Sequence, residues 1–154
     1  MAASRIARRS AAMLRRLGSP DTIELPGVAP DDRRSAADGL ARVVERVRER
    51  APGAHIMLVD DLPIIGAAST HFDGADELRQ RQATLAAAFA SAADRTGAPH
   101  VAASQLTGHE TGTADPWVFG VIDDPQLFGA SLHPNASGST AVALTVFDAL
   151  RSPR

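Results

Sequence analysis

Two short apolar runs, each set between helical patterns, constrain the fold of this chain more than any other feature. The runs are AHIMLV (54–59) and PHVAAS (99–104), and each is continuous rather than alternating, as expected of strands buried on both faces. One helical pattern precedes the first run, a second separates the two runs, and a third closes the chain. Because strands joined by helices pair in parallel, we predict an α/β fold with a helix-covered parallel sheet.

The three helical patterns have recognisable ends. The first follows the cap candidates Asp31 and Asp32, the second stops at Gly97, and the third begins after Asn135. One further strand is predicted at PDTIEL (20–25). The apolar residues predicted to face inward are Ala36, Leu40, Val43, Val44 and Val47 in the first helix, Leu78, Leu85, Phe89, Ala92 and Ala93 in the second, and Val142, Val146, Phe147 and Leu150 in the third.

Polar residues follow both predicted strands. Asp60-Asp61 ends the first run, Ser104 ends the second, and a long irregular stretch covers 105–134. In parallel sheets the functional site lies beyond the carboxyl ends of the strands, and long loops in compact domains tend to be functional. We therefore expect these residues to open onto the functional edge, although an Asp-Asp pair taken alone is more typical of a solvated strand end. His100, which starts the second run, is expected to be structural.

The segment SLHPNASG (131–138) presents one histidine directly before a helix. His133 precedes Pro134, which favours extended backbone, and Asn135 is a good N-terminal cap for the helix. Histidine changes charge near neutral pH and is the most common general base. We predict that His133 is a general base; the alternative is a surface histidine in an ordinary loop-to-helix turn.

Several other kinds of site are absent from the sequence. There is no cysteine, no serine in a Gly-x-Ser-x-Gly elbow and no glycine-rich phosphate loop. His109-Glu110 is followed by Thr113 where the helical zinc motif needs a second histidine, so we predict neither a metal site nor a cofactor. A net charge of −2 gives no argument for nucleic acid, and no apolar run has the length of a membrane span.

Three segments resemble the SGNH hydrolase family, also called the GDSL esterase/lipase family, and its actinobacterial branch most. They are LARVVERVRERAPGAHIMLVDDLPIIG (40–66), SQLTGHETGTADPWVFG (104–120) and SLHPNASGSTAVA (131–143). The first is similar to a helix and strand of that branch, the second to its substrate-side loop, and the third to the block with the catalytic histidine. The resemblance covers residues 40–151 and corresponds to the C-terminal part of such a domain.

This resemblance implies a three-layer α/β/α fold and hydrolysis of carboxylic esters through an acyl-serine intermediate. His133 would be the general base, and the backbone carbonyl of Ala130 would orient its ring in place of the usual aspartate. His109, Asp115 and Trp117 would shape the substrate loop for a small-molecule or lipid ester.

The family's nucleophile has no counterpart at a recognisable position. Neither Gly-Asp-Ser nor Gly-x-Asn-Asp occurs, so the resemblance implies a domain without its N-terminal strands. We predict a basic segment at 1–30 and a partial domain at 31–154, which alone is nearly inactive and self-associates through an unpaired sheet edge. Two alternatives remain: a non-catalytic remnant that binds a ligand or partner or has no activity, and an active enzyme with a relocated serine, Ser104 or Ser131. The compartment is open, because no export signal is present and relatives are often secreted.

Overall fold

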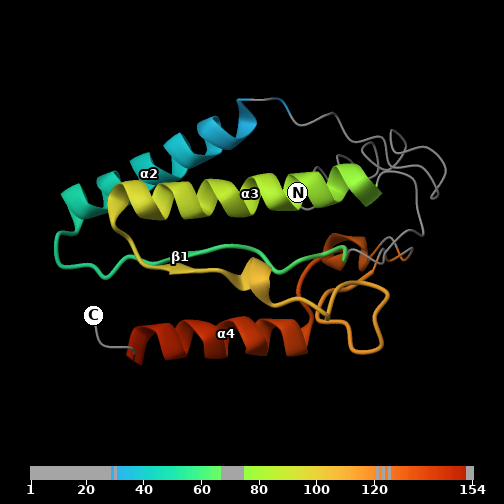
Figure 1. Ribbon diagram of the computed structural model, residues 1–154. Coiled ribbons are helices and arrows are strands. Elements are labelled where there is room, and N and C mark those ends of the chain that lie inside the picture. Colours follow the sequence, from blue (N-terminus) through green and yellow to red (C-terminus); the bar gives the residue numbers. More distant parts are fainter. Residues whose placement is uncertain are drawn as a thin grey trace, which may run out of the picture.

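The computed structural model describes residues 29, 31–66, 75–120, 122, 124 and 126–151 (Figure 1). The predicted strand at 20–25 lies outside these residues, as does the basic segment 1–30 except for residue 29. In chain order the elements are α2 (Asp32–Arg50), β1 (Leu58–Val59), α3 (Ala75–Thr96), β2 (His100–Val101), η1 (Ala103–Gln105), η2 (Phe128–Ala130) and α4 (Ala136–Arg151), where η denotes a 3-10 helix.

The two strands pair in parallel across the α3 crossover. Leu58 lies opposite His100, and Val59 lies opposite Val101. Figure 1 shows α2 and α3 on one side of these strands and α4 on the other, so three layers are present. The predicted α/β class and the parallel pairing are confirmed. The strands are shorter than the predicted runs, because only two residues of each take part in the ladder.

The helix ends agree with the sequence prediction. α3 stops at Gly97, whose φ of +65° lies in the left-handed region that glycine adopts without steric cost. α4 follows Asn135, whose side-chain oxygen accepts the Gly138 backbone N–H at 3.0 Å. At the start of α2, Asp31 is the cap residue but makes no side-chain cap bond, while Asp32 accepts the Ala29 N–H at 2.7 Å.

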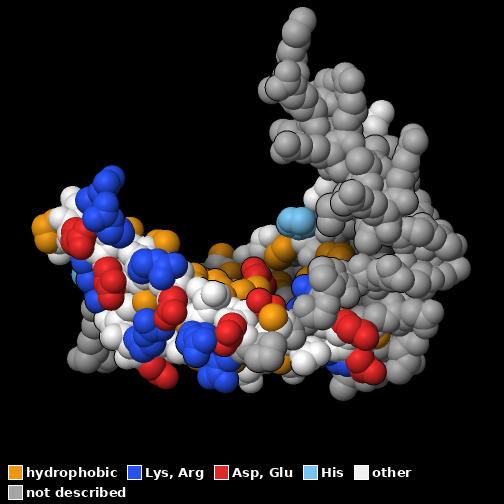
Figure 2. Space-filling model, turned by 90° about the horizontal axis from the view of Figure 1, so that it is seen from above, with side chains coloured by type: hydrophobic (Ala, Val, Ile, Leu, Met, Phe, Trp, Pro, Cys, Tyr) orange, Lys and Arg blue, Asp and Glu red, His pale blue; other side chains and the backbone are white. Residues whose placement is uncertain are grey.

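α2 and α3 pack together through small side chains. The buried residues are Ala37, Ala41 and Val44 on α2 and Ala75, Ala88, Ala92 and Ala93 on α3. Below them, Leu58 of β1 joins Val44, Ala92 and Ala93 in one core cluster. The prediction of an inward Val43 and Val47 is wrong, since these side chains are 60% and 37% exposed. The contact uses the adjacent alanine stripe, because alanine lets two helices approach closely. Figure 2 shows Arg, Asp and Glu side chains mixed over the face that carries these helices.

α4 buries one face and exposes an apolar one. Val142 packs against a second core cluster formed by Leu62, Ala103 and Val118. The predicted inward orientation is wrong for Phe147 and Leu150, which are 51% and 61% exposed. Leu144 of the same helix is 59% exposed. On α3 the predicted inward orientation is wrong for Leu85, which is 38% exposed. In the described part of the chain, apolar surface on α4 therefore remains in solvent.

Candidate functional site

At the carboxyl edge of the sheet, Asp60 is the central polar residue. Its side chain is buried, and it accepts hydrogen bonds from the Ser104 backbone N–H at 2.8 Å and the Ser104 hydroxyl at 2.7 Å. The Nε2 atom of His100 lies 3.3 Å from the same carboxylate, and its ring stacks on Phe89. The structural role predicted for His100 agrees with this position. The interpretation of Asp60 as a solvated strand end is wrong, because the segment after β2 covers it and supplies its donors.

The arrangement around Ser104 is not that of a serine–histidine–acid triad. A serine nucleophile needs a base that accepts its hydroxyl proton and is in turn oriented by a third group. Here the carboxylate lies between the hydroxyl and the imidazole, and the Ser104 hydroxyl donates to Asp60. The cluster ties the loop after β2 to the end of β1.

A tight turn presents His133. The His133 backbone N–H donates to the Ala130 carbonyl at 3.1 Å, and Leu132 within the turn has a φ of 62°. Left-handed backbone is uncommon for a bulky residue and costs of order 1 kcal/mol or more, so it persists only where the surroundings impose it. The turn leaves the His133 side chain exposed at the start of α4.

The imidazole of His133 is oriented by Ser131 rather than Ala130. Its Nδ1 lies 2.9 Å from the Ser131 carbonyl oxygen, whereas the Ala130 carbonyl is occupied by the backbone N–H of the same histidine. This corrects the predicted orienting group by one residue. A carbonyl only accepts, so this contact places a proton on Nδ1. Among the described residues no hydrogen-bond partner of Nε2 is found. With Nδ1 engaged in this way, Nε2 is the ring nitrogen through which His133 could accept a proton.

The three residues predicted for the substrate loop lie together. The rings of His109 and Trp117 stack with centroids 3.7 Å apart and an interplanar angle of 3°. The Nδ1 atom of His109 lies 2.9 Å from the Asp115 backbone oxygen and 3.3 Å from its carboxylate. The Trp117 backbone N–H donates to the His109 carbonyl at 2.8 Å. Ring stacking, a side-chain-to-backbone hydrogen bond and a backbone hydrogen bond thus fix this loop.

A short antiparallel contact joins the substrate loop to the histidine turn. Val118 and Pro134 form an isolated bridge, and the Phe119 N–H donates to the His133 carbonyl at 2.9 Å. The Asn135 N–H donates to the Trp117 carbonyl at 2.9 Å. His133 and Trp117 therefore belong to one hydrogen-bonded unit, which we call the loop clasp (residues 116–119 and 132–135).

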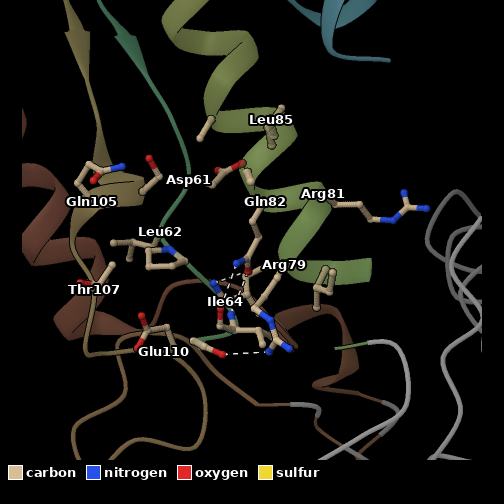
Figure 3. Close-up of a pocket in the computed structure, with 17 residues that line it drawn as sticks. Asp61, Leu62, Ile64, Arg79, Arg81, Gln82, Leu85, Gln105, Thr107 and Glu110 are labelled. Atoms are coloured by element: carbon tan, nitrogen blue, oxygen red, sulfur yellow. Dashed lines mark hydrogen bonds between the residues drawn. The ribbon is translucent and has the colours of Figure 1, made fainter. Parts of the chain in front are cut away.

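A cleft of about 470 Å³ lies beside this edge, between α3 and the segments that follow β1 and β2 (Figure 3). Gln82 holds one rim: its side-chain oxygen accepts the N–H groups of Ile64 and Ile65 at 2.7 and 3.0 Å. On the opposite wall the carboxylate of Glu110, a buried residue, accepts the Gly108 N–H at 3.1 Å. Sequence reasoning missed Gln82 and Glu110, because their partners depend on tertiary contacts that no local pattern encodes.

The cleft and the histidine turn are built from different residues. Ser104 lines the cleft, whereas His133 and Trp117 do not. In the part of the chain that the structure describes, no three His, Asp or Glu residues are placed to hold a metal ion. Within the same part, no helix combines the length and apolar character needed to cross a membrane.

Comparison with known proteins defines the family. The GDSL-like lipase/acylhydrolase family matches residues 14–141, which is most of the chain, so the protein belongs to this family. The match begins upstream of residue 40, where the resemblance noted in the sequence starts. A search of curated proteins and a search of solved structures each gave no match. Family membership supports an esterase- or lipase-type function in general, with small-molecule esters as substrates. The actinobacterial branch stays a prediction.

Proposed function

We propose that this chain carries the general base and the substrate loop of a serine-dependent carboxylic ester hydrolase. The observation that carries the proposal is the His133 imidazole, whose Nδ1 lies 2.9 Å from the Ser131 carbonyl while the side chain is exposed. When the proton is on Nδ1, the Nε2 atom offers its lone pair to a proton donor. Membership in the GDSL-like family supports ester hydrolysis as the chemistry.

In this proposal the steps follow the acyl-serine route. Nε2 of His133 takes the proton of a serine hydroxyl as its oxygen attacks the ester carbonyl carbon, and the imidazolium then gives the proton to the departing alcohol. Water, deprotonated by the same imidazole, then attacks the acyl-serine, and the acid is released as the imidazolium returns the proton to the serine oxygen. The Ser131 carbonyl holds Nδ1–H throughout and stabilises the imidazolium. No cofactor or metal is required.

We propose further that the nucleophile lies outside this sequence, in a Gly-Asp-Ser block that the chain lacks. Two candidates within the chain have other partners: the Ser104 hydroxyl donates to Asp60, and the Ser131 hydroxyl oxygen accepts the Ile122 N–H at 2.9 Å. Loss of the nucleophile of a serine hydrolase costs about 10⁶-fold in turnover in a well-studied protease. The chain alone is then nearly inactive.

The substrate is a small-molecule or lipid ester that contacts the loop of His109, Asp115 and Trp117. This loop supports the proposal because it belongs to the same loop clasp as His133. An aromatic ring pair beside a carboxylate provides an apolar wall with a polar rim, which suits an ester with a polar alcohol part.

The second candidate function is non-catalytic binding of a ligand or partner. The exposed Leu144, Phe147 and Leu150 of α4 favour it, since such residues gather at contact surfaces. Each of the two strands also has an edge without a partner among the described residues, which fits self-association through the sheet.

A fluorophosphonate probe tests the proposal on the chain itself. Such a probe labels an activated serine covalently, and mass spectrometry locates the adduct. We expect no adduct and no hydrolysis of p-nitrophenyl butyrate above the buffer rate. An adduct on Ser104 or Ser131 would show that the nucleophile is relocated within the chain and would overturn the proposal.

Separating an incomplete hydrolase from a binding protein needs the sequence upstream of the Met1 codon. An open frame that encodes Gly-Asp-Ser supports the first, and a stop codon supports the second.

A further inference from the structure

Among the described residues of the loop clasp, Asn135 makes the one side-chain hydrogen bond that joins its two halves. Its Nδ2 donates to the Pro116 carbonyl at 2.6 Å, while its Oδ1 accepts the Gly138 N–H at 3.0 Å. The first bond reaches across to the substrate loop, and the second caps α4. The side chain therefore serves two elements at once.

The carbonyls of three consecutive loop residues are each occupied, and Asn135 supplies two of the three donors. The Asp115 carbonyl faces the His109 ring, the Pro116 carbonyl accepts from the Asn135 side chain, and the Trp117 carbonyl accepts from the Asn135 backbone. Because a helix cap needs only an acceptor, the bond to Pro116 is not required for starting α4. Among the common cap side chains, the asparagine amide has its donor and its acceptor on two different atoms, so it reaches the Pro116 carbonyl and the Gly138 N–H at the same time.

We propose that Asn135 is a positioning residue that sets the His109–Trp117 ring stack relative to His133. It does so by holding the Pro116 carbonyl from the first residue before α4, two positions after His133. Its relevance to ester hydrolysis rests on the proposed function, but the geometric link is testable without any activity. The role differs from capping, because capping concerns α4 alone.

The chain provides its own probe of the ring stack. Trp117 is the single tryptophan and there is no tyrosine, so near-ultraviolet fluorescence reports almost solely on Trp117. Movement of the loop changes the emission maximum and the access of a quencher such as acrylamide.

The test compares variants that separate the two bonds of Asn135. Asn135→Asp and Asn135→Ser keep an oxygen that caps α4, but neither holds the Pro116 carbonyl with an amide donor; Asn135→Ala removes both bonds. We expect the Asn135→Asp and Asn135→Ser variants to shift the Trp117 emission maximum to longer wavelength and to raise acrylamide quenching. Helix content, measured by circular dichroism, should stay at the wild-type level in the Asn135→Asp and Asn135→Ser variants. Thr140→Ala, on the exposed side of the first turns of α4, is the control and should leave Trp117 emission unchanged.

Two results would overturn the assignment. If Asn135→Asp and Asn135→Ser leave the Trp117 emission and its quenching unchanged while Asn135→Ala alters them, Asn135 acts only as a cap. If none of the three alters Trp117, the backbone bonds hold the loop without the side chain. These readouts do not involve ester hydrolysis. Fluorophosphonate labelling therefore tests the proposed function, and Trp117 fluorescence tests the role of Asn135, so one can fail without the other.

Discussion

Replacing Gly138 by alanine should destabilise the protein, although glycine-to-alanine changes in helices normally stabilise. Gly138 lies in the first turn of α4, and a Cβ there would overlap the Trp117 carbonyl oxygen and lie 2.9 Å from Leu62 Cδ1. The carbonyl is backbone and already accepts the Asn135 N–H, so it does not yield easily. Overpacking costs about 1–3 kcal/mol, and we take the upper part of this range because backbone must move. The higher helix propensity of alanine offsets about 1 kcal/mol of this cost, so the free energy of unfolding should fall by about 1–2 kcal/mol.

Urea and thermal unfolding followed by circular dichroism at the helix band measure this loss. For a chain of this size the loss corresponds to a Tm lower by roughly 2–8 °C. The matched control is Gly39→Ala in α2, where the nearest atom to a Cβ is an Arg42 guanidinium nitrogen at 4.0 Å. There the same substitution should stabilise by about 0.4–1 kcal/mol. If Gly138→Ala proves as stable as the wild type while Gly39→Ala behaves as expected, α4 and the Trp117 carbonyl are not in close contact, and the reasoning fails.

Two further substitutions test the edge of the sheet. Gln82→Ala removes the clamp on the rim of the cleft and should cost about 1–3 kcal/mol in urea unfolding, because two N–H groups lose their acceptor; the exposed Gln80→Ala should cost almost nothing. Asp60→Ala leaves the N–H and hydroxyl of Ser104 without their acceptor and should cost about 2 kcal/mol or more, whereas Asp60→Asn, which keeps one acceptor oxygen, should cost less. Equal losses for the two Asp60 variants would show that the carboxylate contacts do not carry its stabilising effect.

The sequence predicted those features that depend on local chemistry. Gly97 ends α3 because a left-handed residue is needed there, and Asn135 caps α4 because its side chain replaces a missing helical acceptor. Both signals lie within a few residues of the element they limit. The parallel pairing of β1 and β2 followed from the order of elements, which sterically allows few alternatives.

Features that depend on long-range contacts were not predictable in the same way. Val43 and Val44 are neighbours on α2, and periodicity cannot tell which of two overlapping stripes faces α3; the alanine stripe does. Asp60 is buried because Ser104, 44 residues away in the chain, covers it. The orienting carbonyl of His133 was displaced by one residue because the left-handed Leu132 turns the chain within that loop.

The central claim is that His133 acts as the base of an ester hydrolase whose serine lies outside this sequence. If the frame upstream of Met1 encodes a Gly-Asp-Ser block, the most direct measurement is kcat for p-nitrophenyl butyrate in a protein that joins this chain to that block, compared with its His133→Ala variant. We expect activity in the first and a loss of about 10⁶-fold in kcat in the second, as for the base of a serine protease. His55→Ala, at an exposed histidine before β1, should retain full activity. Hydrolysis that survives His133→Ala, or an upstream sequence without such a block, would contradict the account.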